Sequence, residues 1–156
     1  LQWRFVVDCP DARNIVLCEN LNFLKTPRIA RDNHIELWYV GGNNISNIDY
    51  IPDHKLTLPL YYSCDWDYDG LKIYERLQDR FARKSKSITL LYPSPILRKS
   101  VDSPEHNSRW KHDQPFSGLI RSAYSQEAIS LIQDLIAQDE WVEEETCELI
   151  EMVKLT

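Results

Sequence analysis

The sequence has no apolar run close to the roughly 18 residues that a membrane-spanning helix needs, so we expect no membrane segment. Its start shows no signal-peptide pattern either. The four cysteines, Cys9, Cys18, Cys64 and Cys147, form no C-x-x-C pair, which argues against a zinc site. Cys18 and Cys64 lie inside apolar segments, where a free buried thiol is the usual state. This cysteine usage predicts a reducing, cytoplasmic environment.

The chain also lacks the excess of positive charge that marks a simple nucleic-acid binder, since its net charge is -6. The charges are unevenly distributed, however. Residues 72–121 hold 11 basic and 5 acidic side chains, whereas residues 122–156 hold 1 basic and 9 acidic ones. A polyanion would therefore meet a basic middle segment. The alternative is that these charges only solvate the surfaces of helices.

No methionine stands at the start, which predicts that the chain is a piece of a longer protein. A length of 156 residues predicts a single domain, residues 1–156, with room for a sizeable core. We expect its α/β core at residues 14–92, and a loop followed by C-terminal helices at residues 93–156.

Short apolar segments alternate with helical patterns along the chain. The predicted strands cover residues 14–18, 35–40, 60–64 and 87–92. Helical patterns occupy residues 20–32 and 46–53 and the segments after Asp69 and Ser125. Pro27 interrupts the first of these patterns. Residues 96–121 are predicted as a loop. A final acidic helix is predicted from Val142, Leu149, Ile150 and Val153. Strands alternating with helices indicate an α/β fold with about four strands in a mainly parallel sheet flanked by helices.

After Leu71, the residues Tyr74, Leu77 and Phe81 repeat at intervals of three and four, which predicts one buried helix face. Asp69 is the expected cap of that helix, because its carboxylate can accept the free N–H groups of the first turn.

Acidic residues follow two of the predicted strands. Residues 61–70 read YYSCDWDYDG, an apolar strand that runs into Asp65, Asp67 and Asp69, and residues 14–20 read NIVLCEN, a strand that ends in Glu19. If the two strands are parallel in one sheet, Glu19, Asp65 and Asp67 meet at the edge where open α/β sheets place their sites. Carboxylates this close together favour a hard divalent cation between them. Trp66 is expected to point away from its two neighbours.

Two other interpretations of the acidic segment remain open. Asp65, Asp67, Asp69 and Gly70 match the first positions of an EF-hand loop, but Arg76 stands where that loop needs its bidentate glutamate, and a strand precedes it. In a purely structural interpretation, Asp69 caps a helix while Asp65 and Asp67 are solvated turn residues.

The order of these motifs resembles the Toprim domain of topoisomerases, primases and related nucleases. The resemblance rests on Cys18-Glu19-Asn20, on Tyr39-Val40-Gly41-Gly42, and on residues 64–73, CDWDYDGLKI, and it covers about residues 14–92. The chain is most similar to the Toprim-like C-terminal domains of Wadjet plasmid-defence nuclease subunits, which resemble the A subunit of topoisomerase VI. The glycine after the D-x-D pair comes one place earlier here than in the family pattern.

The resemblance implies metal-dependent cleavage of DNA phosphodiesters within an anti-plasmid defence protein. It gives Glu19 the role of metal ligand or catalytic acid/base, and Asp65 and Asp67 the role of ligands for Mg2+ or Mn2+, with Asp69 as a possible further ligand. Gly42 is expected to form a tight turn, and Gly70 to let the backbone enter the helix closely. DNA is the implied substrate, and other subunits of a condensin-like defence complex are the implied partners; a homodimer stays open.

Two alternative functions remain. A Toprim-like module can bind a metal or a protein partner without cleaving DNA, and the acidic C-terminal segment suits docking on a basic surface. A topoisomerase VI A-like strand-breaking domain needs a nucleophilic tyrosine from a separate domain, and we name no such residue here. Lys72, Arg76 and Arg80 are candidates for contact with phosphate, although surface residues of this kind are more often only solvated. The four histidines, His34, His54, His106 and His112, show no ligand spacing.

Overall fold

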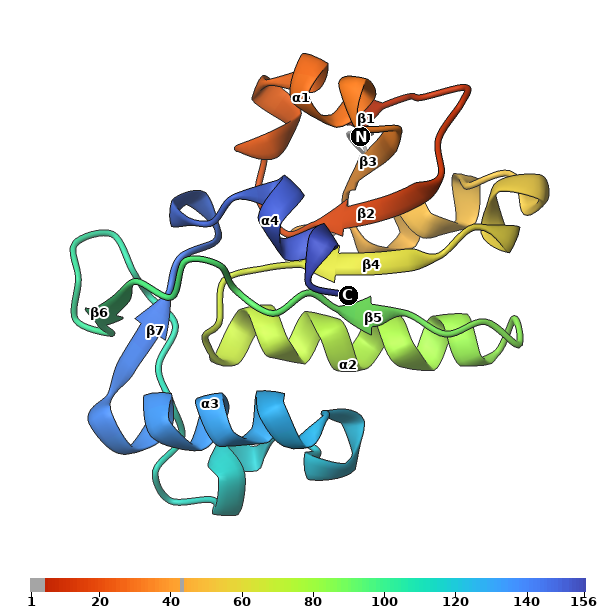
Figure 1. Ribbon diagram of the computed structural model, residues 1–156. Helices are drawn as coiled ribbons and strands as arrows, with labels where there is room; N and C mark the ends of the chain where they lie inside the picture. The colour runs from red at the N-terminus through yellow and green to blue at the C-terminus, as the bar shows by residue number, and fades with distance from the viewer. Residues whose placement is uncertain (1–4, 43) are drawn as a thin grey trace.

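The computed structural model describes residues 5–42 and 44–156, and a five-stranded mixed sheet forms its centre (Figure 1). The strands are β1 (Val6–Val7), β2 (Asn14–Cys18), β3 (Ile35–Tyr39), β4 (Leu60–Ser63) and β5 (Thr89–Leu90), in the order β1-β3-β2-β4-β5. β2 is parallel to both β3 and β4, and β5 is parallel to β4. The α/β class is thereby confirmed. The expected four strands are joined by a fifth, β1, which pairs antiparallel with β3.

The central strands are apolar because both faces of the sheet are covered. Ile15, Val16 and Leu17 of β2 are fully buried, as is Leu37 of β3. A parallel sheet covered on both faces has this composition, in which nearly every side chain is apolar. Continuous apolar runs therefore identified β2, β3 and β4 correctly.

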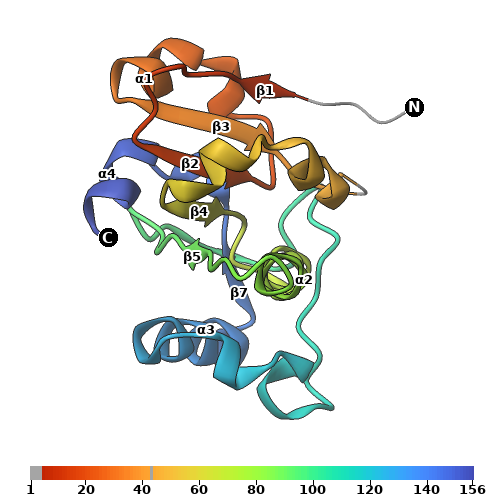
Figure 2. The same cartoon turned by 90° about the vertical axis from the view of Figure 1, so that its right-hand side faces the viewer.

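The longest helix, α2, begins directly after the acidic segment. The helices are α1 (Pro27–Asp32), α2 (Tyr68–Ala82), α3 (Gln126–Gln138) and α4 (Leu149–Lys154), with short 3-10 turns at Phe23–Lys25, Ile45–Tyr50, Asp53–Thr57, Pro115–Gly118, Arg121–Ala123 and Glu144–Thr146. Figures 1 and 2 show α2 running beside β5, with α3 beyond it. The predicted stripe of Leu71, Tyr74, Leu77 and Phe81 is buried, which confirms the predicted helix face.

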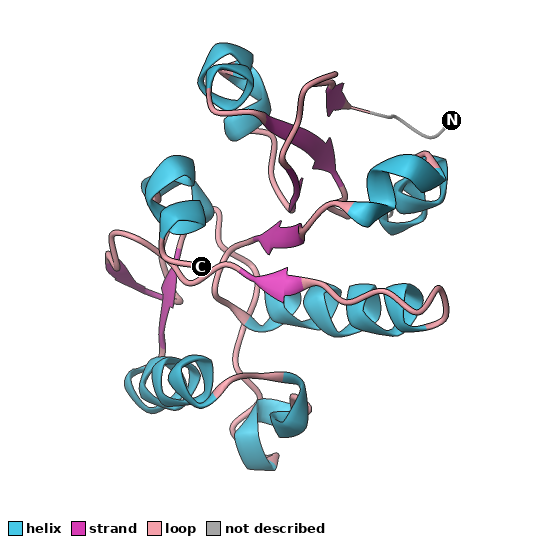
Figure 3. Ribbon diagram, turned by 45° about the vertical axis from the view of Figure 1, so that its right-hand side comes forward, coloured by secondary structure: helices cyan, strands magenta, loops and turns pink. Residues whose placement is uncertain are grey.

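The C-terminal third departs from the prediction. Val142 is part of a strand, β7 (Glu140–Val142), which pairs antiparallel with β6 (Arg98–Ser100) in a second, two-stranded sheet (Figure 3). The last helix begins only at Leu149. Trp141 and Val142 are both buried, and this apolar pair suits a short strand better than a helix with an acidic surface. The cap of α3 is confirmed, since Ser125 Oγ accepts a hydrogen bond from the backbone N–H of Ala128 at 3.1 Å.

Smaller departures have local causes. Only Thr89–Leu90 of the predicted strand 87–92 pairs, and Pro93 follows soon after. Pro27 divides the predicted helix 20–32 and occupies the first turn of α1, where its missing N–H costs nothing. In the predicted turn of residues 41–44, Gly42 has φ +59°, while Asn43 lies outside the described residues. Within the described ranges, no helix is long and apolar enough to cross a membrane.

Candidate metal centre

The candidate site lies where β2 and β4 end side by side. The register pairs Cys18 with Ser63, and the N–H of Glu19 donates to the carbonyl of Ser63 at 2.9 Å, which extends the ladder by one residue. Glu19 and Asp65 therefore lie at the same edge of the sheet, each just beyond the end of its strand. Their contact is direct, since Glu19 Oε1 accepts a hydrogen bond from the backbone N–H of Asp65 at 2.8 Å. The two acids that sequence reasoning placed together are neighbours.

The start of α2 packs against both acids. A Cβ atom added at Gly70 would lie 2.2 Å from the carbonyl oxygen of Asp65 and 2.8 Å from Glu19 Oε1. Only glycine permits this approach, so the expected role of Gly70 is confirmed. The close packing fixes the distance between the strand edge and the helix.

A third carboxylate, Glu144, lies behind these two. It comes from the 3-10 turn after β7 and is fully buried. Its Oε1 accepts from both the backbone N–H and the side-chain amide of Asn20, each at 2.9 Å, and its own N–H donates to Asp65 Oδ1 at 2.8 Å. Asn20 Nδ2 also donates to Asp65 Oδ1, at 3.1 Å. Glu144 Oε2 is buried and has no hydrogen-bond partner within the described part of the chain.

Sequence reasoning missed Glu144. It assigned the run Glu143–Glu145 to the surface of an acidic helix. One signal was present, because Glu144 follows soon after the apolar pair Trp141-Val142, much as Glu19 follows the apolar strand β2. An acid near the end of a short apolar segment was the pattern that singled out Glu19.

Asp67 has two structural partners. Its Oδ1 accepts from the N–H of Gly70 at 2.8 Å and so caps α2, and its Oδ2 lies 2.8 Å from His106 Nε2. The expectation that Asp69 caps this helix is therefore wrong: the helix begins at Tyr68, which leaves Asp67 in the cap position. Asp69 lies in the first turn, exposed, and its own N–H donates to Ser108 Oγ at 3.0 Å.

His106 is the second site residue that sequence reasoning passed over. Its Nδ1 lies 2.8 Å from the carbonyl oxygen of Val101, and its ring stacks on Trp141 with centroids 3.7 Å apart. A carbonyl only accepts, so Nδ1 carries a proton, and Nε2 carries a second one when it donates to the Asp67 carboxylate. Burial works to lower the pKa of His106, but the hydrogen bonds to Asp67 and to Val101, together with the charge of Asp67, outweigh it, so the pKa is raised. In its protonated form, His106 supplies a buried positive charge to Asp67.

The remaining carboxylates lack such a counter-charge. Burial raises the pKa of Glu19 well above its usual range, and the charges of Asp65 and Asp67 add to this effect. Burial, with the charge of Asp67, raises the pKa of Asp65 to about 6. Burial raises the pKa of Glu144 to about 8, and the charge of Asp65 adds to the increase. A cluster of acids with raised pKa values is one that a cation would stabilise.

A hollow of about 180 Å3 joins the cluster to solvent. Asp65 lines it together with Asn20, Lys25, Glu143 and Glu145, so polar groups dominate its wall. Of Glu19, Asp65 and Glu144, it is Asp65 that lines this hollow, whereas Glu144 is fully buried.

The donor set fits a hard divalent cation in its chemistry. Carboxylate and amide oxygens are the ligands that Mg2+ and Mn2+ prefer, and Glu19 Oε2 and Asp65 Oδ2 receive no hydrogen bond from any residue that the structure describes. In residues 5–42 and 44–156, however, no three His, Cys, Asp or Glu side chains already converge as a metal site. Binding thus requires the carboxylates to turn toward a common point.

The cysteines take no part in this centre. All four are free and buried, which confirms the expectation for Cys18 and Cys64. Trp66, expected to point away from the acids, is buried and contacts Tyr92 edge to face with ring centroids 5.6 Å apart.

No family model, no curated protein and no solved structure matches this chain. Its function is therefore argued from the geometry of the site and from the chemistry of the residues that form it.

Proposed function

We propose that this chain is a Toprim-like domain that hydrolyses DNA phosphodiesters with the help of bound Mg2+ or Mn2+. The observation that carries the proposal is the direct contact of Glu19 with Asp65 at the shared edge of two parallel strands. Their raised pKa values support a site built for a cation. The motif order strand-Glu, strand-Gly and strand-D-x-D adds support from the sequence.

Glu19 and Asp65 would hold the ion, because each has a carboxylate oxygen that accepts no hydrogen bond from the described residues. Asp67 would join them only after giving up its contact with His106. Asp69, the possible further ligand in the sequence, is left out of this ligand set, since its carboxylate lies exposed beyond the helix cap. Such an ion, when bound, polarises the phosphodiester and lowers the pKa of an attacking water.

Glu19 is also suited to accept the proton of that water. A general base works best when its pKa lies near the operating pH, and burial moves the pKa of Glu19 in that direction. Glu144 would hold Asn20 in position through its carboxylate, and the Asp65 carboxylate through its own backbone N–H.

A basic flank supports a polyanionic substrate. Arg76, Arg80 and Arg83 line a hollow of about 500 Å3 along α2, beside Gly42. Arg80 contacts Asp49 at 3.3 Å, whereas Arg76 and Arg83 have no acidic partner within ion-pair distance in the described part of the chain. Asp79 lines the same hollow, whereas Glu19, Asp65 and Asp67 do not, so the hollow is a flank of the centre and not a part of it.

Cleavage of supercoiled plasmid tests the proposal. The protein is incubated with plasmid in Mn2+ or in EDTA. We expect nicked or linear DNA in Mn2+ only, and its loss in Asp65→Asn, while Asp69→Asn, a matched change of an exposed carboxylate, keeps most activity. Cleavage that persists in Asp65→Asn at the wild-type rate would contradict the assignment.

A non-catalytic role is the second candidate, and one observation favours it. His106 Nε2 already lies 2.8 Å from Asp67 Oδ2, so one half of the D-x-D pair has its partner without a metal. A module of this kind would bind Mn2+ and yet leave plasmid intact. A topoisomerase VI A-like role would instead leave a covalent adduct between protein and DNA. Membership of an anti-plasmid complex with condensin-like subunits rests on the sequence resemblance.

A further inference from the structure

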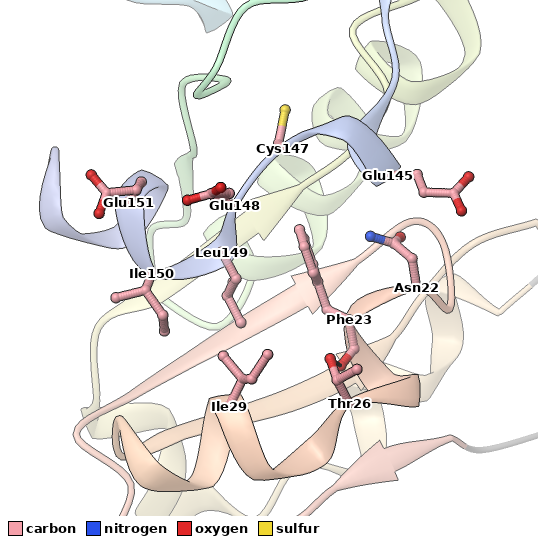
Figure 4. Close-up of a pocket in the computed structure, with 10 residues that line it drawn as sticks. All are labelled: Asn22, Phe23, Thr26, Ile29, Glu145, Cys147, Glu148, Leu149, Ile150 and Glu151. Carbon is pink, nitrogen blue, oxygen red and sulfur yellow. Dashed lines mark hydrogen bonds between the residues drawn. The ribbon is translucent and has the colours of Figure 1, made fainter.

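A second, larger hollow lies between the N-terminal and C-terminal segments of the chain. Its volume is about 520 Å3, and it is bounded by the 3-10 turn Phe23–Lys25 and α1 on one side and by residues 145–151 on the other (Figure 4). Figures 1 and 2 place α4 close to β2 and β4, on the side of the molecule where α1 also lies. None of the roles proposed above uses this hollow.

The floor of the hollow is apolar. Figure 4 shows Leu149 and Ile150 pointing from the last segment toward Ile29 of α1, with Phe23 to one side of Leu149. Ile29 is 49% exposed, although isoleucine is normally buried. Leu149 is buried and Phe23 and Ile150 are partly buried, so Ile29 offers most of the exposed apolar area. Such an area is stabilised when apolar side chains of another molecule cover it.

The rim of the hollow is acidic. Glu145, Glu148 and Glu151 line it, all three are exposed, and none forms an ion pair with a described residue. They belong to residues 122–156, which hold 9 acidic side chains and 1 basic one. The rim therefore presents uncompensated negative charge around an apolar floor.

From this combination we propose that the hollow binds a basic amphipathic helix of a partner protein. Apolar side chains three and four positions apart would rest against Ile29, Leu149 and Ile150, as in other complexes in which a helix lies in a groove. Lysine or arginine side chains on the flanks of that helix would meet the three glutamates. The same rim repels nucleic acid, and an uncharged helix would leave its carboxylates without partners.

The hollow adjoins the candidate metal centre. Asn22 and Glu145 line both this hollow and the smaller one that opens onto Asp65. A helix bound here would lie next to the entrance of the centre. The binding itself does not depend on metal-dependent hydrolysis.

Synthetic helical peptides test the proposal. The probe is a fluorescent 18-residue peptide of leucine and lysine with leucine at helical spacing, compared with a scrambled peptide of the same composition and with a leucine–glutamate peptide. We expect only the ordered leucine–lysine peptide to bind, measured by anisotropy in EDTA. Amide resonance shifts should cluster around Ile29, Leu149 and Ile150.

Two triple variants separate the rim from net charge. We expect Glu145→Gln/Glu148→Gln/Glu151→Gln to weaken peptide binding about ten-fold, which three exposed ion pairs account for. The control Asp53→Asn/Asp113→Asn/Glu127→Gln removes three exposed charges elsewhere and should change the affinity less than about two-fold.

Ile29→Ser tests the floor and should weaken binding without changing its salt dependence. Equal binding of the ordered and scrambled peptides would overturn the proposal. So would equal losses in the two triple variants, or resonance shifts spread over the whole surface.

Discussion

Replacing Glu144 with glutamine should make the protein more stable at high pH. In the unfolded chain this carboxyl loses its proton near its usual pKa of 4.5, whereas in the folded protein it keeps the proton until about pH 8. Between these values the unfolded state binds fewer protons, so the free energy of unfolding falls as the pH rises. For one group with these two pKa values, the loss between about pH 5 and pH 8 is about 3.5 kcal/mol.

Glutamine removes this loss and keeps the contacts. Its Oε1 can accept from Asn20 as the carboxylate does, and its amide group replaces Oε2, which has no hydrogen-bond partner in the described part of the chain. Urea unfolding in EDTA gives the free energy of unfolding at both pH values. Between about pH 5 and pH 8, we expect the free energy of unfolding of Glu144→Gln to rise by about 3.5 kcal/mol relative to that of the wild type.

The control is Glu145→Gln, a neighbouring acid whose side chain is exposed. It should follow the wild-type pH profile. If the profiles of the wild type and Glu144→Gln run parallel, Glu144 is ionised in the folded protein, and the account of the buried acids is wrong. An unchanged dependence on urea concentration shows that the same surface is exposed on unfolding in each variant.

Three further changes test the architecture. Gly70→Ala places a Cβ 2.2 Å from the Asp65 carbonyl oxygen, so the free energy of unfolding in urea should fall by about 1–3 kcal/mol. An unchanged stability would contradict the close approach of helix and strand. His106→Ala leaves Asp67 buried without its cation and should lower the free energy of unfolding by about 3–5 kcal/mol. Because the raised pKa of His106 stabilises the fold fully below pH 6.5, this loss should shrink as the pH rises through the folded pKa. A loss that does not depend on pH would argue against the ion pair. Ser125→Ala removes a helix cap and should cost about 1 kcal/mol, whereas no loss in thermal unfolding would show the cap to be dispensable.

The parts of the fold that sequence reasoning predicted are those with local patterns. The buried stripe of α2 repeats every three to four residues, and β2, β3 and β4 are continuous apolar runs. The meeting of Glu19 with Asp65 followed from one further step, because parallel strands bring their carboxyl ends to one edge.

The rest of the site depends on contacts between distant parts of the chain. Glu144 lies 124 residues from Asn20, and His106 lies 39 residues from Asp67. Neither contact has a local pattern, because the packing of β6 and β7 against the core brings both residues into place. β1 was missed for a different reason: it has only two residues, and its pairing with β3 alone defines it.

Calorimetric titration with Mn2+ tests the central claim most directly, because it measures metal binding without requiring cleavage. The wild type is compared with Asp65→Asn and with Asp69→Asn, which changes an exposed carboxylate beside the centre. We expect the wild type and Asp69→Asn to bind Mn2+, and Asp65→Asn to lose binding. If the wild type binds no Mn2+, or if Asp65→Asn binds as tightly as the wild type, then Glu19 and Asp65 do not form a metal centre.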